Sequence, residues 1–260
     1  MLVHPSAPPA AVLSSPAPPA EVVVEGHGIV KRFGAGTSAV EALRGVGVAF
    51  HRGSFTAIMG PSGSGKSTLL HILAGLDRPT AGWVELAGQR LDLLGDRDLT
   101  LLRRRRVGFV FQTYNLLPVL TAEENITLPL RIGGARIDRD WLETLIGAVG
   151  LGERRDHRPA ELSGGQQQRV AVARALVTRP AVVFGDEPTG NLDSAAGREV
   201  LALLRGAVDD LGQTIVMVTH DPSAATVADR VVFLADGAIA GIEERPTIDA
   251  ILNHLRSGPR

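Results

Sequence analysis

Short apolar runs alternate with stretches of helical periodicity along most of the chain. The runs that predict strands are Val22–Val24, Val46–Phe50, Phe55–Met59, Trp83–Leu86, Val107–Phe111, Ala181–Phe184, Thr214–Thr219 and Arg230–Ala235. Helical periods cover roughly residues 65–74, 122–178, 194–211 and 222–229, and glycines and prolines interrupt the longest of them. Apolar strands that alternate with helices predict a parallel sheet covered on both faces, with the stretch 122–178 inserted into that α/β core.

The composition limits the class of protein without naming a function. With 260 residues, the chain predicts one large domain or one domain with an insertion, long enough to fold without disulfides or metal. Cysteine is absent, which excludes disulfides, Cys-ligated metals and thiol catalysis. The formal net charge of −1 and the pI near 6.7 give no support to a nucleic-acid partner or to direct binding of an anionic membrane.

The N-terminal segment differs from the rest of the chain. Residues 1–20 place prolines at close intervals among Ala and Ser, which predicts a disordered, partly extended tail. Its PxxP spacings would also suit an aromatic groove on a partner. The segment lacks the basic start and unbroken apolar core of a signal peptide. No run approaches the roughly 18 apolar residues that span a bilayer, so we expect contact with a membrane only through a partner.

A glycine-rich segment between a predicted strand and a predicted helix has the spacing of a phosphate-binding loop. It satisfies G-x-x-x-x-G-K-[ST] with Gly60, Pro61, Ser62, Gly63, Ser64, Gly65, Lys66, Ser67 and Thr68. The glycines let backbone N–H groups approach phosphate oxygens, and the helix N-terminus adds partial positive charge. Lys66 is one of only two lysines in the chain, and it supplies a point charge for the β and γ phosphates. Ser67 supplies a hydroxyl for Mg²⁺, so the segment predicts a nucleoside triphosphate site.

Two carboxylates follow a second buried strand. The run Ala181–Phe184 leads through Gly185 to Asp186 and Glu187, at the carboxyl end of a parallel strand, where ligands bind. Asp186 is expected to hold Mg²⁺, and Glu187 to orient or deprotonate the attacking water. An acid pair at the start of a loop is structurally ordinary by itself. Its place after a phosphate loop in the same predicted sheet favours the catalytic interpretation.

A second glycine-rich helix start lies at residues 162–166. Ser163 is a natural N-cap, which is the ordinary structural explanation. Gly164 and Gly165 are not needed for capping, however, and they leave the N–H groups of a positive helix end bare for an anion. Because the segment has no lysine, it is expected to complete another site, such as that of a neighbouring molecule.

These motifs, in this order, resemble those of ATP-binding cassette (ABC) ATPases. The order is Gly60–Thr68, Gln112, Leu162–Gln166, Asp186-Glu187, Asn191-Leu192-Asp193 and His220, and the match covers about residues 22–245. Val107–Leu130 and Asp186–Ser194 look like the macrolide-exporter and lipoprotein-release branch of that superfamily. The resemblance implies an α/β P-loop NTPase core with a mostly parallel sheet, an N-terminal antiparallel β part and a helical insertion subdomain. It places the ATPase domain at 21–245, the insertion at about 113–178 and a C-terminal helix or tail at 246–260.

The resemblance also implies that each ATP is shared by two ATPase subunits that face head to tail. Ser163, Gly164, Gly165 and Gln166 of one subunit would contact the nucleotide bound at Lys66 of the other, in a probable homodimer. Asp193 would lie at the dimer interface. Gln112 would lie near Mg²⁺ and the attacking water, and His220 would hydrogen-bond the γ-phosphate and hold Glu187 in place.

Some of these residues also have ordinary structural interpretations. Phe33 matches the aromatic that stacks on adenine in the family, yet it could belong to the core. A histidine like His220 is often structural when it stands alone. The arginine run 103–106 could bind nucleic acid, but a solvated helix end is the more economical interpretation. The partly apolar segment Thr113–Pro129 resembles the groove that receives a helix of a membrane subunit, or it packs inside the helical insertion.

The function that the resemblance implies is an ATP-hydrolysing subunit that drives a separate transmembrane permease, most plausibly in export or lipoprotein extrusion. It implies a peripheral location on the cytoplasmic face of the cell membrane. An ATP-driven regulator of a membrane protein, without cargo, uses the same chemistry and stays an alternative. A soluble ATPase acting on DNA or ribosomes is disfavoured, because the chain has one phosphate loop, one signature and no sustained heptads. The cargo is not encoded in this chain.

Overall fold

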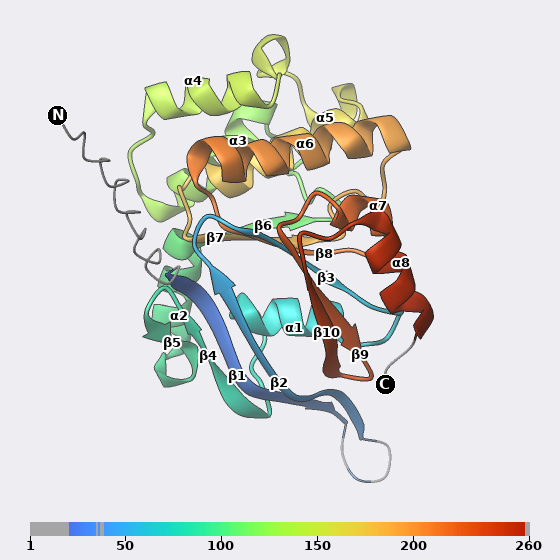
Figure 1. Cartoon of the computed structure of the whole chain (residues 1–260). Coiled ribbons are helices and arrows are strands. Elements are labelled where there is room, and N and C mark those ends of the chain that lie inside the picture. Colours follow the sequence, from blue (N-terminus) through green and yellow to red (C-terminus); the bar gives the residue numbers. More distant parts are fainter. Residues whose placement is uncertain (1–20, 35, 37–38, 258–260) are drawn as a thin grey trace, which may run out of the picture.

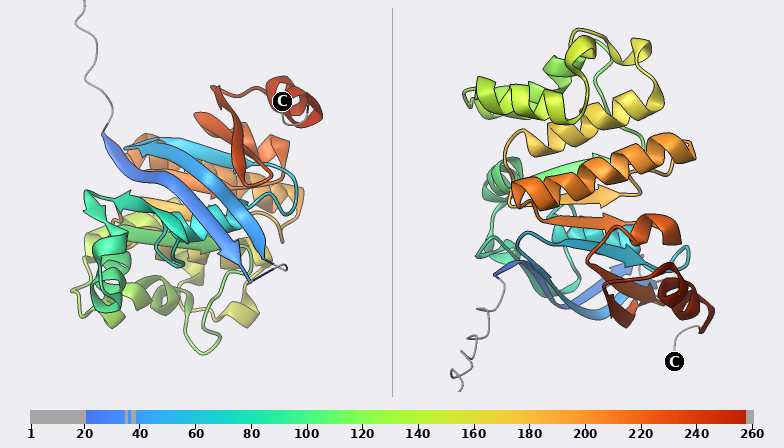
Figure 2. Two further views of the ribbon diagram at one scale, coloured as in Figure 1. Left: turned by 90° about the horizontal axis from the view of Figure 1, so that it is seen from below. Right: turned by 45° about the horizontal axis from the view of Figure 1, so that its top comes forward.

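The chain folds into stacked layers of strands and helices (Figure 1). The computed structural model describes residues 21–34, 36 and 39–257, so the tail predicted at 1–20 lies outside the described residues. In Figure 2 (right) the helices α4, α5 and α6 lie above a central sheet, with α1 and a second sheet below it. The layers therefore follow the α/β arrangement that the apolar pattern predicts.

After three initial strands, helices and strands follow one another along the described chain, singly or in short groups. The strands are β1 (Val22–Phe33), β2 (Val40–His51), β3 (Phe55–Met59), β4 (Ala81–Leu86), β5 (Gln89–Arg90), β6 (Val107–Phe111), β7 (Val182–Asp186), β8 (Ile215–Val218), β9 (Arg230–Ala235) and β10 (Ala238–Glu244). The helices are α1 (Lys66–Leu73), α2 (Asp96–Arg106), α3 (Ala122–Gly133), α4 (Arg139–Ala148), α5 (Gly164–Leu176), α6 (Ser194–Leu211), α7 (Pro222–Ala225) and α8 (Ile248–Ser257).

Two sheets organise these strands. The larger has the order β10-β9-β3-β8-β7-β6, and all its neighbouring strands are parallel except the edge pair β10 and β9. The smaller has the order β2-β1-β4-β5 and is antiparallel throughout. This arrangement confirms the predicted fold class, including its N-terminal antiparallel part.

Side chains alternate between two cores across the central sheet, as the pleat of a strand requires. In β8, Ile215 and Met217 pack on the side of α5 and α6, whereas Val216 and Val218 pack on the side of α1 and the smaller sheet. A strand that is apolar on both faces has helices or strands to cover each of them. The strands β7 and β8 are buried on both faces because they lie inside the larger sheet, between its two covering layers.

The parallel register brings the carboxyl ends of four strands into one row. Phe111 pairs with Asp186, Asp186 with Val218, and Val218 with Ile58. The residues that follow these positions are Gln112, Glu187, Thr219 and, one residue beyond Met59, Gly60. Segments far apart in the sequence thus meet at a single edge of the sheet, where ligands bind in open α/β sheets.

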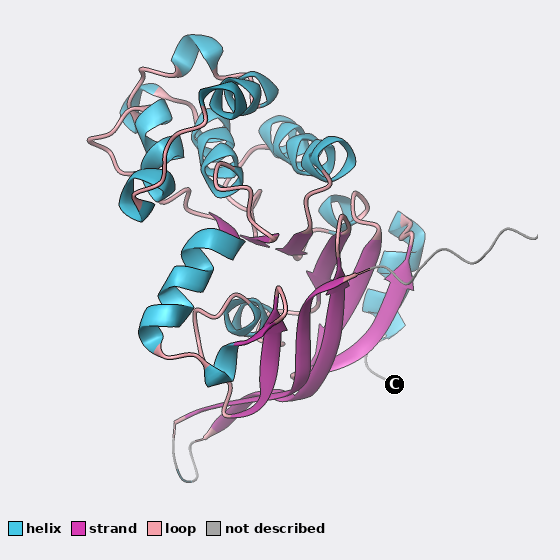
Figure 3. Cartoon of the chain, turned by 90° about the vertical axis from the view of Figure 1, so that its left-hand side faces the viewer, coloured by secondary structure: helices cyan, strands magenta, loops and turns pink. Residues whose placement is uncertain are grey.

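The helices α3, α4 and α5 fall within the stretch 113–178 and gather at one end of the molecule, apart from most strands (Figure 3). Thr121 and Glu124 form a capping box at the start of α3, and Gly134 closes that helix in the left-handed conformation. None of the helices in the described ranges combines the length and the apolar character that a membrane crossing requires.

Several elements differ in extent from the sequence expectation. The predicted helical period at 222–229 contains only the short helix α7, because Asp221 caps it and the chain turns into β9 soon afterwards. The strand predicted at Val22–Val24 continues to Phe33 as the long strand β1. The apolar pattern missed the edge strand β10, whose residues alternate between exposed and partly buried positions and whose apolar residues are interrupted by Gly241.

Candidate nucleotide-binding and catalytic site

The phosphate loop connects β3 to α1, as its spacing predicts. Gly60, Gly63 and Gly65 all have positive φ angles, of 154°, 81° and 99°. A Cβ on Gly60 would lie 1.9 Å from the carbonyl oxygen of Leu234, and one on Gly65 would lie 2.4 Å from that of Ala42. Glycine is therefore required by both conformation and space.

The first turn of α1 is left open to a ligand. Its N-cap is Gly65, which provides no side-chain cap, and no acidic residue lies in its first turn. The helices α3, α4, α5 and α6 all have side-chain caps on their N-terminal N–H groups. An uncapped helix start beside a glycine-rich turn is suited to bind an anion.

Lys66 supplies the positive charge of the loop. Its Nζ donates to the carbonyl oxygens of Gly60 at 2.9 Å and Pro61 at 2.7 Å, and the residue is only 7% exposed. Burial lowers the pKa of Lys66, and the neighbouring Glu187 and Asp186 partly oppose that shift. This buried ammonium is held by neutral carbonyls and has no ion-pair partner among the described residues, so it is suited to pair with phosphate.

The acid pair is split between two contacts. Ser67 Oγ donates to Asp186 Oδ1 at 2.9 Å, and His220 Nδ1 lies 2.9 Å from Glu187 Oε2. Glu187 adopts a left-handed backbone with φ of 48°, which is unusual for a residue with a side chain. Strain of this kind concentrates at functional sites, and here it directs two adjacent carboxylates to different partners.

The hydroxyl of Ser67 and the carboxylate of Asp186 fit a magnesium site. Both are hard oxygen ligands of the kind that Mg²⁺ prefers, and Mg²⁺ commonly takes few protein ligands beside substrate phosphates. Consistently, the described residues contain no cluster of three or more His, Cys, Asp or Glu side chains able to form an all-protein metal cage. The oxygen pair is therefore suited to a metal that shares its coordination with a nucleotide.

A groove of about 530 Å³ runs along the phosphate loop. It is lined by Ala42, Ser62, Gly63, Gly65, Lys66, Ser67, Thr68, Glu187 and His220. The structure thus brings the predicted phosphate loop together with the predicted base and histidine. Ala42, on β2, was not anticipated from the sequence, because an alanine in a strand carries no chemical signal.

Other predicted residues lie outside that lining. Phe33 ends β1, is 46% exposed and has Lys31 Nζ 5.0 Å from its ring centroid. It pairs with Val40, on the strand that also carries Ala42. The ring of Phe33 is therefore accessible to solvent and does not lie in the core. It stands beside the start of β2, two residues before the groove residue Ala42.

The signature segment also lies outside the groove lining of its own chain. Ser163 caps α5 reciprocally with Gln166, which satisfies the ordinary structural explanation. A Cβ on Gly164 would lie 2.9 Å from the hydroxyl of Tyr114, and one on Gly165 would lie 3.0 Å from Cβ of Ala196. Close packing therefore explains the two glycines in part, beside any role in anion binding.

Gln112 and Asp193 make contacts within this chain that were not among the sequence predictions. Gln112 Nε2 donates to Asn191 Oδ1 at 3.1 Å, and Asn191 Nδ2 donates back to the Gln112 carbonyl at 3.1 Å. Asp193 caps α6 by accepting from the N–H groups of Ala195 and Ala196. Asp193 therefore has a structural role in this chain, whatever its role at an interface.

Two further contacting residues were missed. His71 Nε2 lies 3.5 Å from Asp186 Oδ2, so His71 and Ser67, four residues apart on α1, face the same carboxylate. That helical spacing was a signal available in the sequence. Arg174 on α5 donates to the carbonyl oxygens of Tyr114 at 2.7 Å and Asn115 at 2.6 Å, and burial lowers its pKa. No sequence motif marks that contact.

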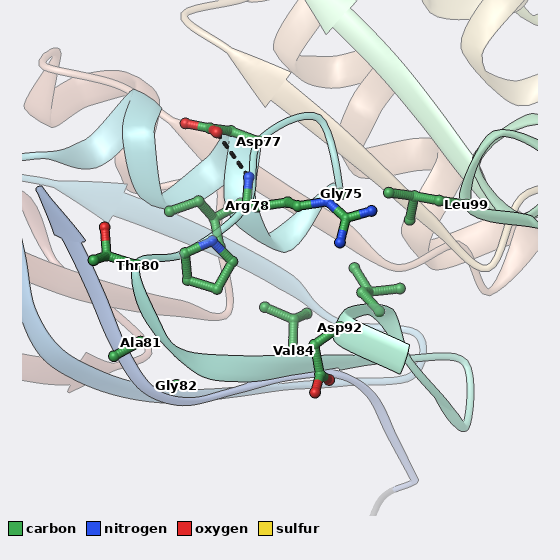
Figure 4. A pocket seen from close by; sticks show the side chains of 12 residues that line it. Gly75, Asp77, Arg78, Thr80, Ala81, Gly82, Val84, Asp92 and Leu99 are labelled. Atoms are coloured by element: carbon green, nitrogen blue, oxygen red, sulfur yellow. Dashed lines mark hydrogen bonds between the residues drawn. The ribbon is translucent and has the colours of Figure 1, made fainter. Parts of the chain in front are cut away.

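A second pocket, of about 140 Å³, lies between the end of α1, β4 and α2 (Figure 4). Its charged side chains pair with others: Asp77 with Lys31, Arg78 with Asp96, and Asp92 with Arg90. The remaining lining is largely apolar, and the pocket brings together none of the predicted site residues. Of these two cavities, only the phosphate-loop groove brings predicted site residues together.

Comparisons with known proteins agree with this geometry. A family model described as ABC transporter matches residues 43–190. An uncharacterized ABC transporter ATP-binding protein of Thermotoga maritima is 49% identical over 228 residues, which are 87% of this chain and 97% of that protein. The macrolide export ATP-binding/permease protein MacB of Marinobacter nauticus is 48% identical over 219 residues, which are 84% of this chain and 34% of that protein. The chain thus spans about a third of the MacB relative.

A solved structure is similar over nearly the same length. The dimeric post-hydrolysis state of the ATP-binding cassette MJ0796, bound to ADP and Pi, has a TM-score of 0.78 and 40% sequence identity. It covers 86% of this chain and 100% of its own. Together, the family match, the relatives and the phosphate-loop geometry identify the chain as an ATP-binding, ATP-hydrolysing subunit that belongs to the ABC transporter family.

Proposed function

We propose that two copies of this chain assemble head to tail, so that each ATP lies between the groove of one copy and residues 163–166 of the other. The observation that carries this proposal is the composition of the groove. It combines the phosphate loop with Glu187 and His220, while the signature segment of the same chain contributes no residue to its lining. A homodimer would bring the missing half to each site, and the dimeric MJ0796 structure supports that arrangement.

Within this sandwich, Glu187 acts as the general base for the attacking water. His220, 2.9 Å from its carboxylate, orients Glu187 and donates to the γ-phosphate. Lys66 and the open N-terminus of α1 bind the β and γ phosphates and stabilise the charge that develops on them. The opposing Gly164 and Gly165 contribute N–H groups and Ser163 contributes its hydroxyl, because the Ser163 N–H is already bonded to Gln166. Closure of the dimer thereby completes the site.

Ser67 and Asp186 would hold Mg²⁺ together with the nucleotide, and Gln112, in the loop after β6, would lie near it. The metal, when bound, neutralises charge on the β and γ phosphates. In the present conformation Gln112 bonds to Asn191, so its approach requires a rearrangement of this pair. Phe33 stacks on the adenine, for which its half-exposed ring leaves room.

The mechanical output is directed to a separate transmembrane permease, for export. The similarity to MacB, a macrolide export ATP-binding/permease protein of which this chain spans about a third, supports an export role. The segment between β6 and α3 provides a docking surface: Leu117 is 45% exposed and Val119 is 72% exposed. The fully buried Asn125 fixes this segment through the main chain of Leu117, Leu120 and Thr121. Apolar side chains displayed on a well-held loop suit a protein partner. Such a partner would place the chain on the cytoplasmic face of the membrane.

The Glu187→Gln variant tests this function. It removes the base but preserves size and the phosphate loop, so the variant should bind ATP and form a stable dimer. Its hydrolysis rate should fall by about 10²–10⁴-fold. Light scattering after size exclusion, with ATP and with ADP, measures the dimer, and phosphate release measures hydrolysis.

Glu199→Gln on α6 is the matched control, because Glu199 is exposed and the same charge is lost away from the site. The control should hydrolyse ATP at the wild-type rate and form no long-lived dimer. A Glu187→Gln variant that stays monomeric with ATP and hydrolyses it normally would refute both the base and the shared site.

A further inference from the structure

A buried glutamine lies in the middle of the signature helix. Gln168 is 0% exposed and sits on α5 shortly after the signature segment, among apolar neighbours such as Val170 and Val172. Burying a side-chain amide is unfavourable unless it is hydrogen-bonded. The hydrogen-bond partners of this amide therefore indicate the role of Gln168.

Both of its hydrogen bonds leave the helix. Gln168 Nε2 donates to the carbonyl oxygen of Phe111 at 3.1 Å and, at close range, to that of Pro188. Phe111 immediately precedes Gln112, and Pro188 immediately follows Glu187. The Oε1 atom has no hydrogen-bond partner among the described residues, so the amide is oriented entirely by its donor side.

The two acceptors belong to adjacent strand ends. Phe111 pairs with Asp186 in the register of β6 and β7. Gln168 bonds to the carbonyl of Phe111 itself and to that of Pro188, two residues after Asp186, and so bridges the two strand ends. Glu187 lies inside this bridge with its φ of 48°, a conformation that surrounding contacts must maintain. On its other side, the N–H of Glu187 donates to the carbonyl of Val218 at 3.0 Å. On the side of α5, Gln168 restrains the main chain next to Glu187 through its hydrogen bond to Pro188.

We propose that Gln168 is a positioning residue for ATP hydrolysis, which ties the signature helix to the main chain that carries Gln112 and Glu187. When residues 163–166 bind the nucleotide of a partner, this amide transmits their position to the loops that carry Gln112 and Glu187. Those two loops belong to the nucleotide site of the same copy as the helix. The two sites of the dimer are thereby linked through one side chain in each copy. This inference rests on the roles proposed above for Gln112 and Glu187.

The chain offers a matched control in Gln213. It is also buried, and its Nε2 donates to two carbonyl oxygens, those of Pro180 and Thr214, at 3.2 Å each. It lies just before β8, at the opposite edge of the sheet from Asp186. Replacing either glutamine by methionine removes the same two hydrogen bonds with little change in volume.

The first test compares Gln168→Met with Gln213→Met. Both should lower the unfolding temperature by similar amounts. Only Gln168→Met should lower kcat, by at least about tenfold, with KM for ATP nearly unchanged, because a small displacement of catalytic groups costs rate more than binding. Equal kcat values for the two variants would overturn the proposal.

Gln168→Glu provides a second test that also serves if Gln168→Met does not fold. A carboxyl at this place can donate to Phe111 or Pro188 only when protonated, and burial between carbonyl oxygens favours the protonated form. Its rate relative to wild type should therefore rise as the pH falls from about 8 to about 6. A ratio that does not change with pH would count against the positioning role.

Glu187→Gln, assayed alongside, separates this inference from the proposed function. If Glu187→Gln hydrolyses ATP normally, the proposed catalytic site is wrong. If Glu187→Gln is inactive and the Gln168 variants keep full kcat at all pH values, the proposed site stands and only the inference about Gln168 fails.

Discussion

Ser67 Oγ donates a 2.9 Å hydrogen bond to Oδ1 of Asp186, and this contact joins the start of α1 to the end of β7. The opposite oxygen of the same carboxylate faces His71, so both oxygens of Asp186 are oriented from one helix. The phosphate loop and the acid strand are therefore placed relative to each other by side chains as well as by the sheet.

Ser67→Ala should raise the Mg²⁺ concentration needed for half-maximal hydrolysis by about tenfold or more, because one of the two proposed protein oxygen ligands is lost. A titration of the hydrolysis rate with Mg²⁺ at saturating ATP measures the midpoint. Ser194→Ala, which removes an exposed hydroxyl next to the cap of α6, should leave it unchanged. An unchanged midpoint for Ser67→Ala would remove Ser67 from the metal site.

His220→Ala should lower kcat by about 10²-fold, because Glu187 loses the group that orients its carboxylate. The His220 side chain is 68% exposed, so the unfolding temperature should change little. ATP should still drive dimer formation, since the phosphate loop is intact. Single-turnover phosphate release checks the chemical step, and a rate within threefold of wild type would assign His220 a structural role.

Glu187→Gly should be more stable than Glu187→Gln. Glycine relieves the left-handed strain at φ of 48°, while its greater unfolded-state entropy offsets part of that gain. The expected difference is on the order of 0.5–1 kcal/mol in the free energy of unfolding, measured by urea denaturation. At the helical position Glu199 the order should reverse, with glycine less stable than glutamine. If glutamine were more stable than glycine at position 187 as well, the backbone of Glu187 would carry no strain.

The sequence predicted the central sheet and the phosphate loop because both depend on local patterns. Apolar runs marked the strands β3, β6, β7, β8 and β9, and fixed spacing marked Gly60–Thr68. The register that places Phe111, Asp186 and Val218 in one row depends on pairing between distant segments. That pairing decides which of the predicted residues meet.

Contacts made by ordinary residues could not be predicted in this way. Gln168, Arg174 and Asn125 hold main-chain carbonyls of neighbouring loops, and each lies in a helix where its residue type is unremarkable. Only the packing of α5 and α3 against the loops reveals their partners. The cap at Asp193 was detectable, because Asp before a helical period is a common N-cap, but the family resemblance drew attention to an interface instead.

Substitution can separate the capping role of Asp193 from its proposed role at the dimer interface. The N–H groups of Ala196 and Ala195 lower the pKa of its carboxyl, so the charged form is favoured in the folded state. A depressed folded pKa contributes stability above the unfolded value of 3.8, and this stability is lost as the pH falls through the folded pKa. Asp193→Asn keeps an N-cap without a charge and should lose this acid dependence, whereas Asp193→Ala should be less stable at neutral pH.

In the Glu187→Gln background, ATP-driven dimer formation by Asp193→Asn then tests the proposed interface role separately from the cap. Weaker dimerisation of a stably folded Asn variant supports a contact across the dimer, and unchanged dimerisation leaves Asp193 with the cap alone.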